Sequence, residues 1–275
     1  MGASSPLLGT LPRVAKRRLD TLLAERGLYE SRSRAAAAVI AGDVRVAGRP
    51  ATKPGELVAD EADVAVAEAP PYVSRGGVKL ANALDAFGLD PAGRRALDVG
   101  ASTGGFTDVL LQRGAESVIA LDVAYGELHW RLRNDDRVVV IERKNARSLE
   151  RGELPYEPDL IVADVSFISL EKVMPAVVAA AAPRFDFLAM VKPQFEVGRE
   201  RVGKGGVVRS AEDRRDALVA VGEFARSELG LAVRGYTPSG LPGPAGNRES
   251  FVWLAEGGRE GALEDLQAAA RRAEP

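Results

Sequence analysis

Residues 97–106 read LDVGASTGGF, and this stretch decides the fold of the chain. A short apolar strand that carries Asp98 runs into a glycine-rich turn, and a helical pattern follows. Such a turn lets a bound molecule approach the backbone closely. The nicotinamide fingerprint requires G-x-G-x-x-G, whereas three residues separate Gly100 from the pair Gly104 and Gly105. The spacing therefore disfavours a dehydrogenase.

Short apolar segments on both sides of this turn alternate with segments of helical length. Five of them are rich in β-branched residues and predict strands at 96–99, 118–123, 138–141, 160–163 and 187–191. Buried strands separated by helices indicate a parallel sheet covered on both faces. The segments 233–236 and 251–254 can add an antiparallel pair at one edge. We therefore predict a Rossmann-like α/β fold.

Composition excludes several kinds of chemistry. The 275 residues include no cysteine and one histidine, His129, which removes disulfides, thiol nucleophiles and zinc sites built from histidine and cysteine. The longest nearly apolar run, 173–183, contains Pro175 and is too short to span a membrane. We expect a soluble cytoplasmic protein that needs neither a metal nor a membrane.

Charge is distributed unevenly along the chain. Residues 1–58 contain ten Lys and Arg against five Asp and Glu, whereas the remaining residues contain 27 against 34, and the net charge is −2. A basic module attached to an acidic body is a common feature of nucleic-acid-binding proteins. A basic helix face exposed to water would give the same counts.

The basic segment predicts a small α+β unit. One helix is expected over 17–26 and a second from a cap at Ser31 or Ser33 to Gly42, followed by a hairpin with 44–46 as its first strand. Five arginines are expected near the helix starts and the first strand, where they could meet phosphates: Arg17, Arg18, Arg32, Arg34 and Arg45.

The order of these features resembles the S4-type RNA-binding module. The resemblance covers about 17–66 and implies that the five arginines contact RNA. Pro70-Pro71 favours an extended connection. We therefore expect five segments, which are a tail (1–12), the S4-type domain (13–67), a linker (68–75), the Rossmann-like domain (76–256) and a C-terminal helical segment (257–275).

The glycine turn resembles motif I of the Rossmann-like methyltransferases, whose cofactor is S-adenosylmethionine. The resemblance implies that Asp98 and the turn hold the methionine part of the cofactor, and that Asp122 takes the ribose hydroxyls. Asn145 is a further candidate, for the adenine edge. The turn residues concerned are Gly100, Ser102, Gly104, Gly105 and Phe106. A glycine turn that only packs a helix on a strand remains an alternative.

Four charged residues suggest a reaction centre. Asp164 and Lys192 follow predicted strands, Glu249 precedes the last one, and Lys79 lies early in the domain. Strand ends are where open α/β sheets place their chemistry, although each residue alone is read more simply as a surface charge. Together they resemble the Lys-Asp-Lys-Glu tetrad of the FtsJ class of ribose 2′-O-methyltransferases.

With the S4-type module added, the whole chain resembles the TlyA, or hemolysin A, family of ribosomal RNA cytidine 2′-O-methyltransferases. The resemblance implies ribosomal RNA or ribosomal subunits as partners. Lys192 would be the general base, with Lys79 as a neighbouring cation, Asp164 orienting the amine, and Glu249 fixing Lys79 or the ribose.

Three alternatives remain open from the sequence. They are a methyltransferase with another acceptor, a membrane-active hemolysin, and an RNA-binding protein without catalysis. The segment 198–204 reads G-x-x-x-x-G-K but lacks the Ser or Thr of a P-loop, so we expect it to form a mobile loop on the substrate side.

Overall fold

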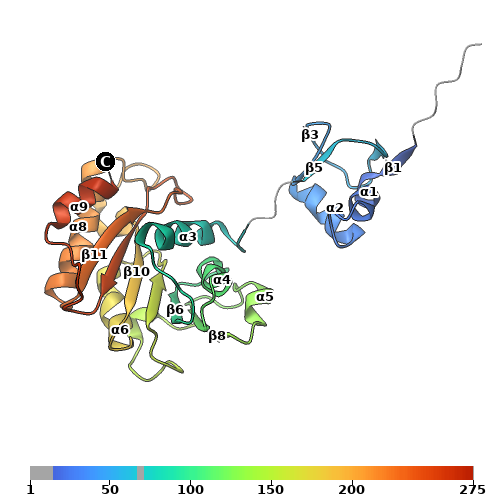
Figure 1. Cartoon of the computed structure of the whole chain (residues 1–275). Helices are drawn as coiled ribbons and strands as arrows, with labels where there is room; N and C mark the ends of the chain where they lie inside the picture. The colour runs from blue at the N-terminus through green and yellow to red at the C-terminus, as the bar shows by residue number, and fades with distance from the viewer. Residues whose placement is uncertain (1–14, 67–70, 275) are drawn as a thin grey trace, which may run out of the picture. The chain divides into compact units, whose positions relative to one another are not determined.

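The computed structural model describes residues 15–66 and 71–274 and divides into two compact units, Met1–Ala69 and Pro70–Pro275. We call them the N-terminal unit and the C-terminal unit (Figure 1). The expected tail (1–12) and residues 68–70 of the expected linker lie outside the described residues.

The N-terminal unit packs two helices beside two small sheets. Its elements are β1 (Lys16–Arg18), α1 (Leu19–Glu25), α2 (Arg32–Ala41), β2 (Val44–Val46), β3 (Arg49–Pro50), β4 (Leu57–Ala59) and β5 (Val64–Val66). Strand β1 pairs with β4, and β2 lies between β3 and β5, all antiparallel. Leu19, Leu23 and Val39 are fully buried between these elements and form the centre of a small core.

The second predicted helix of this unit is confirmed, whereas the start of the first is wrong. Ser31 caps α2 by accepting a hydrogen bond from Arg34 N at 3.2 Å, and Gly42 ends the helix at φ 86°. Helix α1 begins at Leu19 because the residues before it pair with β4 as a strand. Arg17 and Arg18 therefore lie on β1, and Arg18 is the N-cap residue of α1, so both stand beside the helix start as predicted.

The C-terminal unit is built on a seven-stranded sheet. Its strands are β6 (Arg95–Val99), β7 (Ser117–Leu121), β8 (Val138–Ile141), β9 (Leu160–Ala163), β10 (Asp186–Val191), β11 (Ala232–Pro238) and β12 (Ser250–Ala255). The order is β11-β12-β10-β9-β6-β7-β8. Strands β6 to β10 are parallel, whereas β12 runs antiparallel to both β10 and β11. The predicted sheet and its antiparallel edge are confirmed.

Helices cover both faces of this sheet (Figure 1). They are α3 (Arg75–Phe87), α4 (Gly105–Gln112), α5 (Trp130–Arg133), α6 (Met174–Ala179), α7 (Pro193–Glu196), α8 (Ala211–Ser227) and α9 (Leu266–Ala273), with short 3-10 turns η1 (Ala146–Ser148), η2 (Leu170–Lys172) and η3 (Arg199–Arg201). Side chains of α6, α8 and α9 pack in one core with one face of the sheet. Those of α3 and α4 pack in a second core with the other face.

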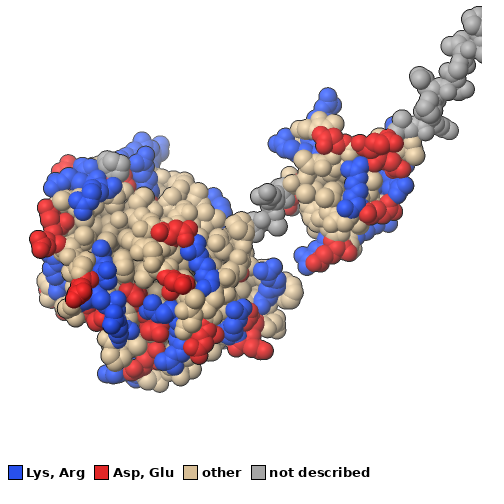
Figure 2. Space-filling model, viewed as in Figure 1, with Lys and Arg blue, Asp and Glu red and all other residues tan. Residues whose placement is uncertain are grey.

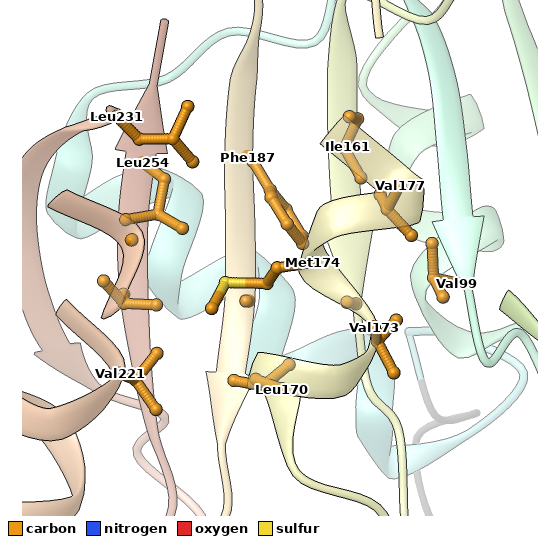
Figure 3. Close-up of a cluster of buried hydrophobic side chains, with 14 of the residues drawn as sticks. Val99, Ile161, Leu170, Val173, Met174, Val177, Phe187, Val221, Leu231 and Leu254 are labelled. Carbon is orange, nitrogen blue, oxygen red and sulfur yellow. The ribbon is translucent and has the colours of Figure 1, made fainter. Parts of the chain in front are cut away.

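The first of these cores fixes the segment that follows β9. Met174 and Val177 of α6 lie against Phe187 and Ile161 of the sheet (Figure 3). All four side chains are fully buried. Burial of a side chain of this size stabilises the fold by about 1.5–3 kcal/mol. This packing anchors the chain on the far side of the loop between β9 and α6, which carries Asp164.

The strand order reverses beside β6, because the chain goes from β6 to β7 on one side and returns to β9 on the other. In open α/β sheets a crevice forms at the carboxyl ends of the strands at such a point. Gly100 follows β6 and Asp164 follows β9, so both lie at this crevice. No helix among the described residues is long and apolar enough to cross a membrane.

Candidate functional site

Two adjoining clefts open at the carboxyl ends of the strands. The larger cleft has a volume of about 990 Å³, and Gly100, Asp122, Asn145 and Asp164 are among its lining residues. The smaller cleft has a volume of about 350 Å³ and is lined by Lys192 and Glu249, among others. Both clefts share four residues: Ser166, Phe167, Gln194 and Phe195. Two molecules could therefore meet at this shared wall.

Gly100 lets the turn after β6 pass close to the segment after β9. Its φ is +85°, and a Cβ atom placed on it would lie 2.7 Å from the backbone oxygen of Asp164. Two residues further on, Ser102 N donates to Asp122 Oδ2 at 2.7 Å. The turn thus brings the ends of β6, β7 and β9 to the wall of one cleft.

Asp98 supports the turn from inside the protein. It is fully buried, and its Oδ2 accepts hydrogen bonds from Thr107 N at 2.9 Å and Thr107 Oγ1 at 2.7 Å, whereas Oδ1 has no partner. Burial raises the pKa of Asp98 to about 7. Asp98 does not line the larger cleft, so in this structure it holds the start of α4. Its predicted contact with the methionine moiety stays a prediction.

Replacing Asp98 by asparagine should change how stability depends on pH. Between pH 3.8 and about 7, Asp98 keeps its proton in the folded protein but loses it in the unfolded chain. The unfolding free energy of the wild-type protein therefore falls as pH rises through this range. Asp98→Asn removes this loss. Its unfolding free energy relative to wild type should therefore increase between about pH 5 and about pH 8, as urea denaturation measures. A difference that stayed constant would show that Asp98 is ionised throughout.

Three further residues of the glycine-rich stretch, Gly104, Gly105 and Phe106, pack against other segments of the protein. A Cβ on Gly104 would meet Leu132, and one on Gly105 would lie 2.9 Å from Gly77 N, so these glycines allow close approach of other segments. Phe106 is buried against Phe251, with ring centroids 5.9 Å apart. None of the three lines the larger cleft. Their predicted contacts with the cofactor remain untested.

Asp122 and Asn145 lie on the larger cleft, as a cofactor site would require. Each carboxylate oxygen of Asp122 accepts one backbone hydrogen bond, from Ser102 N and from Ala124 N at 2.8 Å. A carboxylate oxygen accepts more than one hydrogen bond, so both oxygens retain capacity for neighbouring hydroxyls. Asn145 caps η1 through its Oδ1, which accepts from Arg147 N at 3.1 Å, and its side-chain NH₂ has no protein partner among the described residues.

The four charged residues form two ion pairs. Lys192 Nζ lies 2.5 Å from Asp164 Oδ1, and Lys79 Nζ lies 2.5 Å from Glu249 Oε2. Both lysines are 8% exposed and Glu249 is 4% exposed. Buried ion pairs contribute little net stability because the charges lose their hydration. The Lys79–Glu249 pair is buried on both sides, whereas Asp164 is half-buried. Two ion pairs with buried lysines beside adjoining clefts therefore indicate a chemical role for these residues.

The comparisons with known proteins agree with this geometry. Residues 72–256 match the FtsJ-like methyltransferase family, and residues 17–64 match the S4 domain. The chain belongs to the FtsJ-like methyltransferase family. The predicted fold class and family are thereby confirmed.

Of three relatives of this FtsJ-like methyltransferase, one is named as an rRNA methyltransferase and two are named as hemolysins. The 16S/23S rRNA (cytidine-2′-O)-methyltransferase TlyA of Mycobacterium tuberculosis is 52% identical over 86% of this chain and 89% of its own length. Hemolysin A of Brachyspira hyodysenteriae is 42% identical over 70% of this chain and 80% of its own. A solved Streptococcus thermophilus structure, provisionally called a hemolysin, is 38% identical with a TM-score of 0.71 and covers 95% of this chain and 96% of its own.

Sequence reasoning missed three residues of this FtsJ-like site. Ser166 Oγ accepts a hydrogen bond from Lys192 Nζ at 2.8 Å. Phe167 is 91% exposed at a φ of +64°, and its ring centroid lies 5.4 Å from that of Phe195. Glu196 accepts from Leu170 N at 3.0 Å and from Ser169 Oγ at 2.7 Å, and burial raises its pKa. Of these three residues, only Ser166 could have been suspected from the sequence, because it stands two residues after Asp164.

Three of the five arginines that were predicted to contact RNA form salt bridges within the N-terminal unit. Arg18 and Arg32 both pair with the buried Asp20, at 2.7 and 3.1 Å. Arg17 pairs with Glu25 and Asp60. Arg34 and Arg45 are exposed and form no salt bridge with any described residue. The last two are thus the better placed of the five for a phosphate.

Proposed function

We propose that this protein transfers a methyl group from S-adenosylmethionine to the 2′-hydroxyl of a cytidine ribose in ribosomal RNA. The observation that carries the proposal is the presence of two ion pairs, Asp164–Lys192 and Glu249–Lys79, beside two adjoining clefts. The name of the Mycobacterium tuberculosis relative supports the acceptor. The S4 domain, residues 17–64, supports RNA as the partner.

The larger cleft fits the cofactor by its size and its donor set. Ligand sites typically measure about 300–1,000 Å³, and this one has about 990 Å³. Asp122 would accept from the two ribose hydroxyls, Asn145 would contact the adenine edge, and the backbone around Gly100 would adjoin the methionine part. S-adenosylmethionine supplies a methyl group on a positively charged sulfur, which is already a good leaving group.

The smaller cleft would hold the acceptor ribose, and Lys192 would act on it. Lys192 would accept the hydroxyl proton, the hydroxyl oxygen would bond to the methyl carbon, and the bond between that carbon and the sulfur of the cofactor would break. Asp164 and Ser166 contact Nζ at 2.5 and 2.8 Å and hold it in place. Such alignment is a large part of catalysis in a displacement reaction. Glu249, which also lines the smaller cleft, would fix the ribose while Lys79 holds it in place.

The exposed ring of Phe167 would give the acceptor base a surface to stack on. It lies on the wall that both clefts share, next to Phe195. RNA-binding proteins commonly stack an unpaired base on an aromatic ring. Glu196 would keep Phe167 in place by holding Ser169 and Leu170 of the same loop.

Methyl transfer with labelled S-adenosylmethionine tests the proposal. We expect label in ribosomal RNA when the protein is incubated with unmodified 16S or 23S transcripts or with isolated subunits. Asp122→Ala should lose most of the incorporation at low cofactor concentration. A parallel assay of dye release from anionic lipid vesicles addresses the hemolysin names. Dye release without any labelled RNA would contradict the proposal.

A further inference from the structure

We propose that the C-terminal unit has its own RNA-binding surface beside the smaller cleft, which takes phosphates flanking the methylated nucleotide. This inference rests on the proposed function. The surface, which we call the arginine rim, consists of Arg209, Arg215, Arg248, Arg271 and Arg272. Four of these side chains are exposed and Arg215 is half-buried.

Glu274 contacts two of the five rim arginines, Arg215 and Arg248. The Glu274 side chain is buried and pairs with Arg214, which is also buried and whose Nε and Nη2 donate to Oε1 at 2.8 and 2.6 Å. Its backbone oxygen accepts from Arg215 Nη1 at 3.3 Å, and Arg248 Nη1 lies 3.5 Å from Oε1. Residues of α8, the loop before β12 and the end of α9 thus meet around one residue.

The rim has an excess of positive charge. Arg214 already compensates the carboxylate of Glu274, and no described carboxylate other than Glu274 forms a salt bridge with a rim arginine. Nearby Asp213 and Asp216 are both paired with Arg201. Figure 2 shows Lys and Arg side chains gathered over the part of the unit where Figure 1 places α9. Because like charges repel, such a group on an otherwise acidic unit indicates an anionic partner.

The rim adjoins the smaller cleft through its neighbours in the chain. Arg248 stands between Asn247 and Glu249, which both line that cleft. Arg209 follows Val208, whose N–H donates to Asn247 Oδ1 at 2.9 Å. The backbone oxygen of Arg209 accepts a hydrogen bond from Arg214 Nη1 at 2.7 Å. Guanidinium groups bind phosphates with two parallel hydrogen bonds. RNA phosphates on the rim would therefore lie next to the ribose that the cleft holds.

The test compares two triple variants that lose the same charge. Arg209→Gln, Arg271→Gln and Arg272→Gln remove rim arginines and leave the contacts of Glu274 intact. Arg95→Gln, Arg151→Gln and Arg184→Gln remove three exposed arginines elsewhere in the C-terminal unit. For both we would measure affinity for the 16S and 23S transcripts over a range of KCl concentrations, together with S-adenosylmethionine affinity and the melting temperature.

We expect the rim variant to bind the transcripts at least about 10-fold more weakly than the control variant. Its slope of log affinity against log salt should fall by roughly 2 to 3, about one for each lost phosphate contact. Cofactor affinity and melting temperature should match the control. Methyl transfer should need more RNA to saturate.

Equal affinities and equal salt slopes for the two triple variants would overturn the inference. So would a rim variant that keeps its RNA affinity but loses binding to phosphatidylglycerol vesicles, since the rim would then be a membrane surface. Failure of the proposed function is a separate result. In that case the wild-type protein would methylate no transcript, whereas the binding comparison between the variants could still be made.

Discussion

Replacing Lys192 by methionine should reduce single-turnover methyl transfer by about 10²- to 10⁴-fold, the usual contribution of a positioned general base. Methionine keeps an unbranched side chain of similar length in a position that is 8% exposed. Lys192 does not line the larger cleft. The affinity for S-adenosylmethionine, measured by calorimetry, should therefore change little.

Lys192→Arg separates proton transfer from charge. Arginine keeps the positive charge beside Asp164, but it does not give up a proton in proteins and so cannot act as a base. We expect this variant to be nearly as inactive as Lys192→Met. Near-normal transfer by Lys192→Arg would show that Lys192 acts through its charge alone.

Replacing Gly100 by alanine should weaken both the binding of S-adenosylmethionine and the transfer of the methyl group. The new Cβ would lie 2.7 Å from the backbone oxygen of Asp164, and neither backbone segment can move without moving the residues that follow β6 or β9. Relieving such a clash costs about 1–3 kcal/mol. We expect affinity for S-adenosylmethionine to fall roughly 10-fold or more, since 1.4 kcal/mol corresponds to a factor of ten. Methyl transfer should fall further, because Asp164 also holds Lys192.

Gly152→Ala is the matched control. Gly152 has a φ of +89°, close to the +85° of Gly100, but a Cβ there would meet nothing within 4 Å. Both variants therefore carry the left-handed backbone penalty of about 1–2 kcal/mol, and only Gly100→Ala carries the clash. Similar loss of cofactor affinity in the two variants would mean that the approach of Gly100 to Asp164 is unimportant.

Much of the C-terminal unit could be predicted because its signals are local. Runs such as 138–141 and 160–163 are apolar throughout, as in the strands of a covered parallel sheet, and both match the observed bounds. The run 160–163 is fully buried, whereas 138–141 is the partly exposed edge strand β8. Strand β1 could not be found this way. Lys16–Arg18 are three exposed basic residues, and they form a strand only because β4, about forty residues later, offers its backbone.

The site shows the same division between local and long-range information. Resemblance singled out Asp164 and Lys192 and implied that they act together. The strand order, which no local pattern shows, is what brings them within 2.5 Å of each other. Glu274 had no signal at all, since a glutamate after a charged helix usually faces water. Its burial follows from Arg214, which lies 60 residues earlier in the sequence.

Nucleoside analysis of the product tests the central claim most directly. Ribosomal RNA that has reacted with the protein and S-adenosylmethionine would be digested to nucleosides and analysed by mass spectrometry. We expect 2′-O-methylcytidine to appear in the wild-type reaction and to form at least about 100-fold more slowly with Lys192→Met. A methyl group on a base, or on no nucleoside at all while the protein binds the cofactor and RNA, would contradict the assignment.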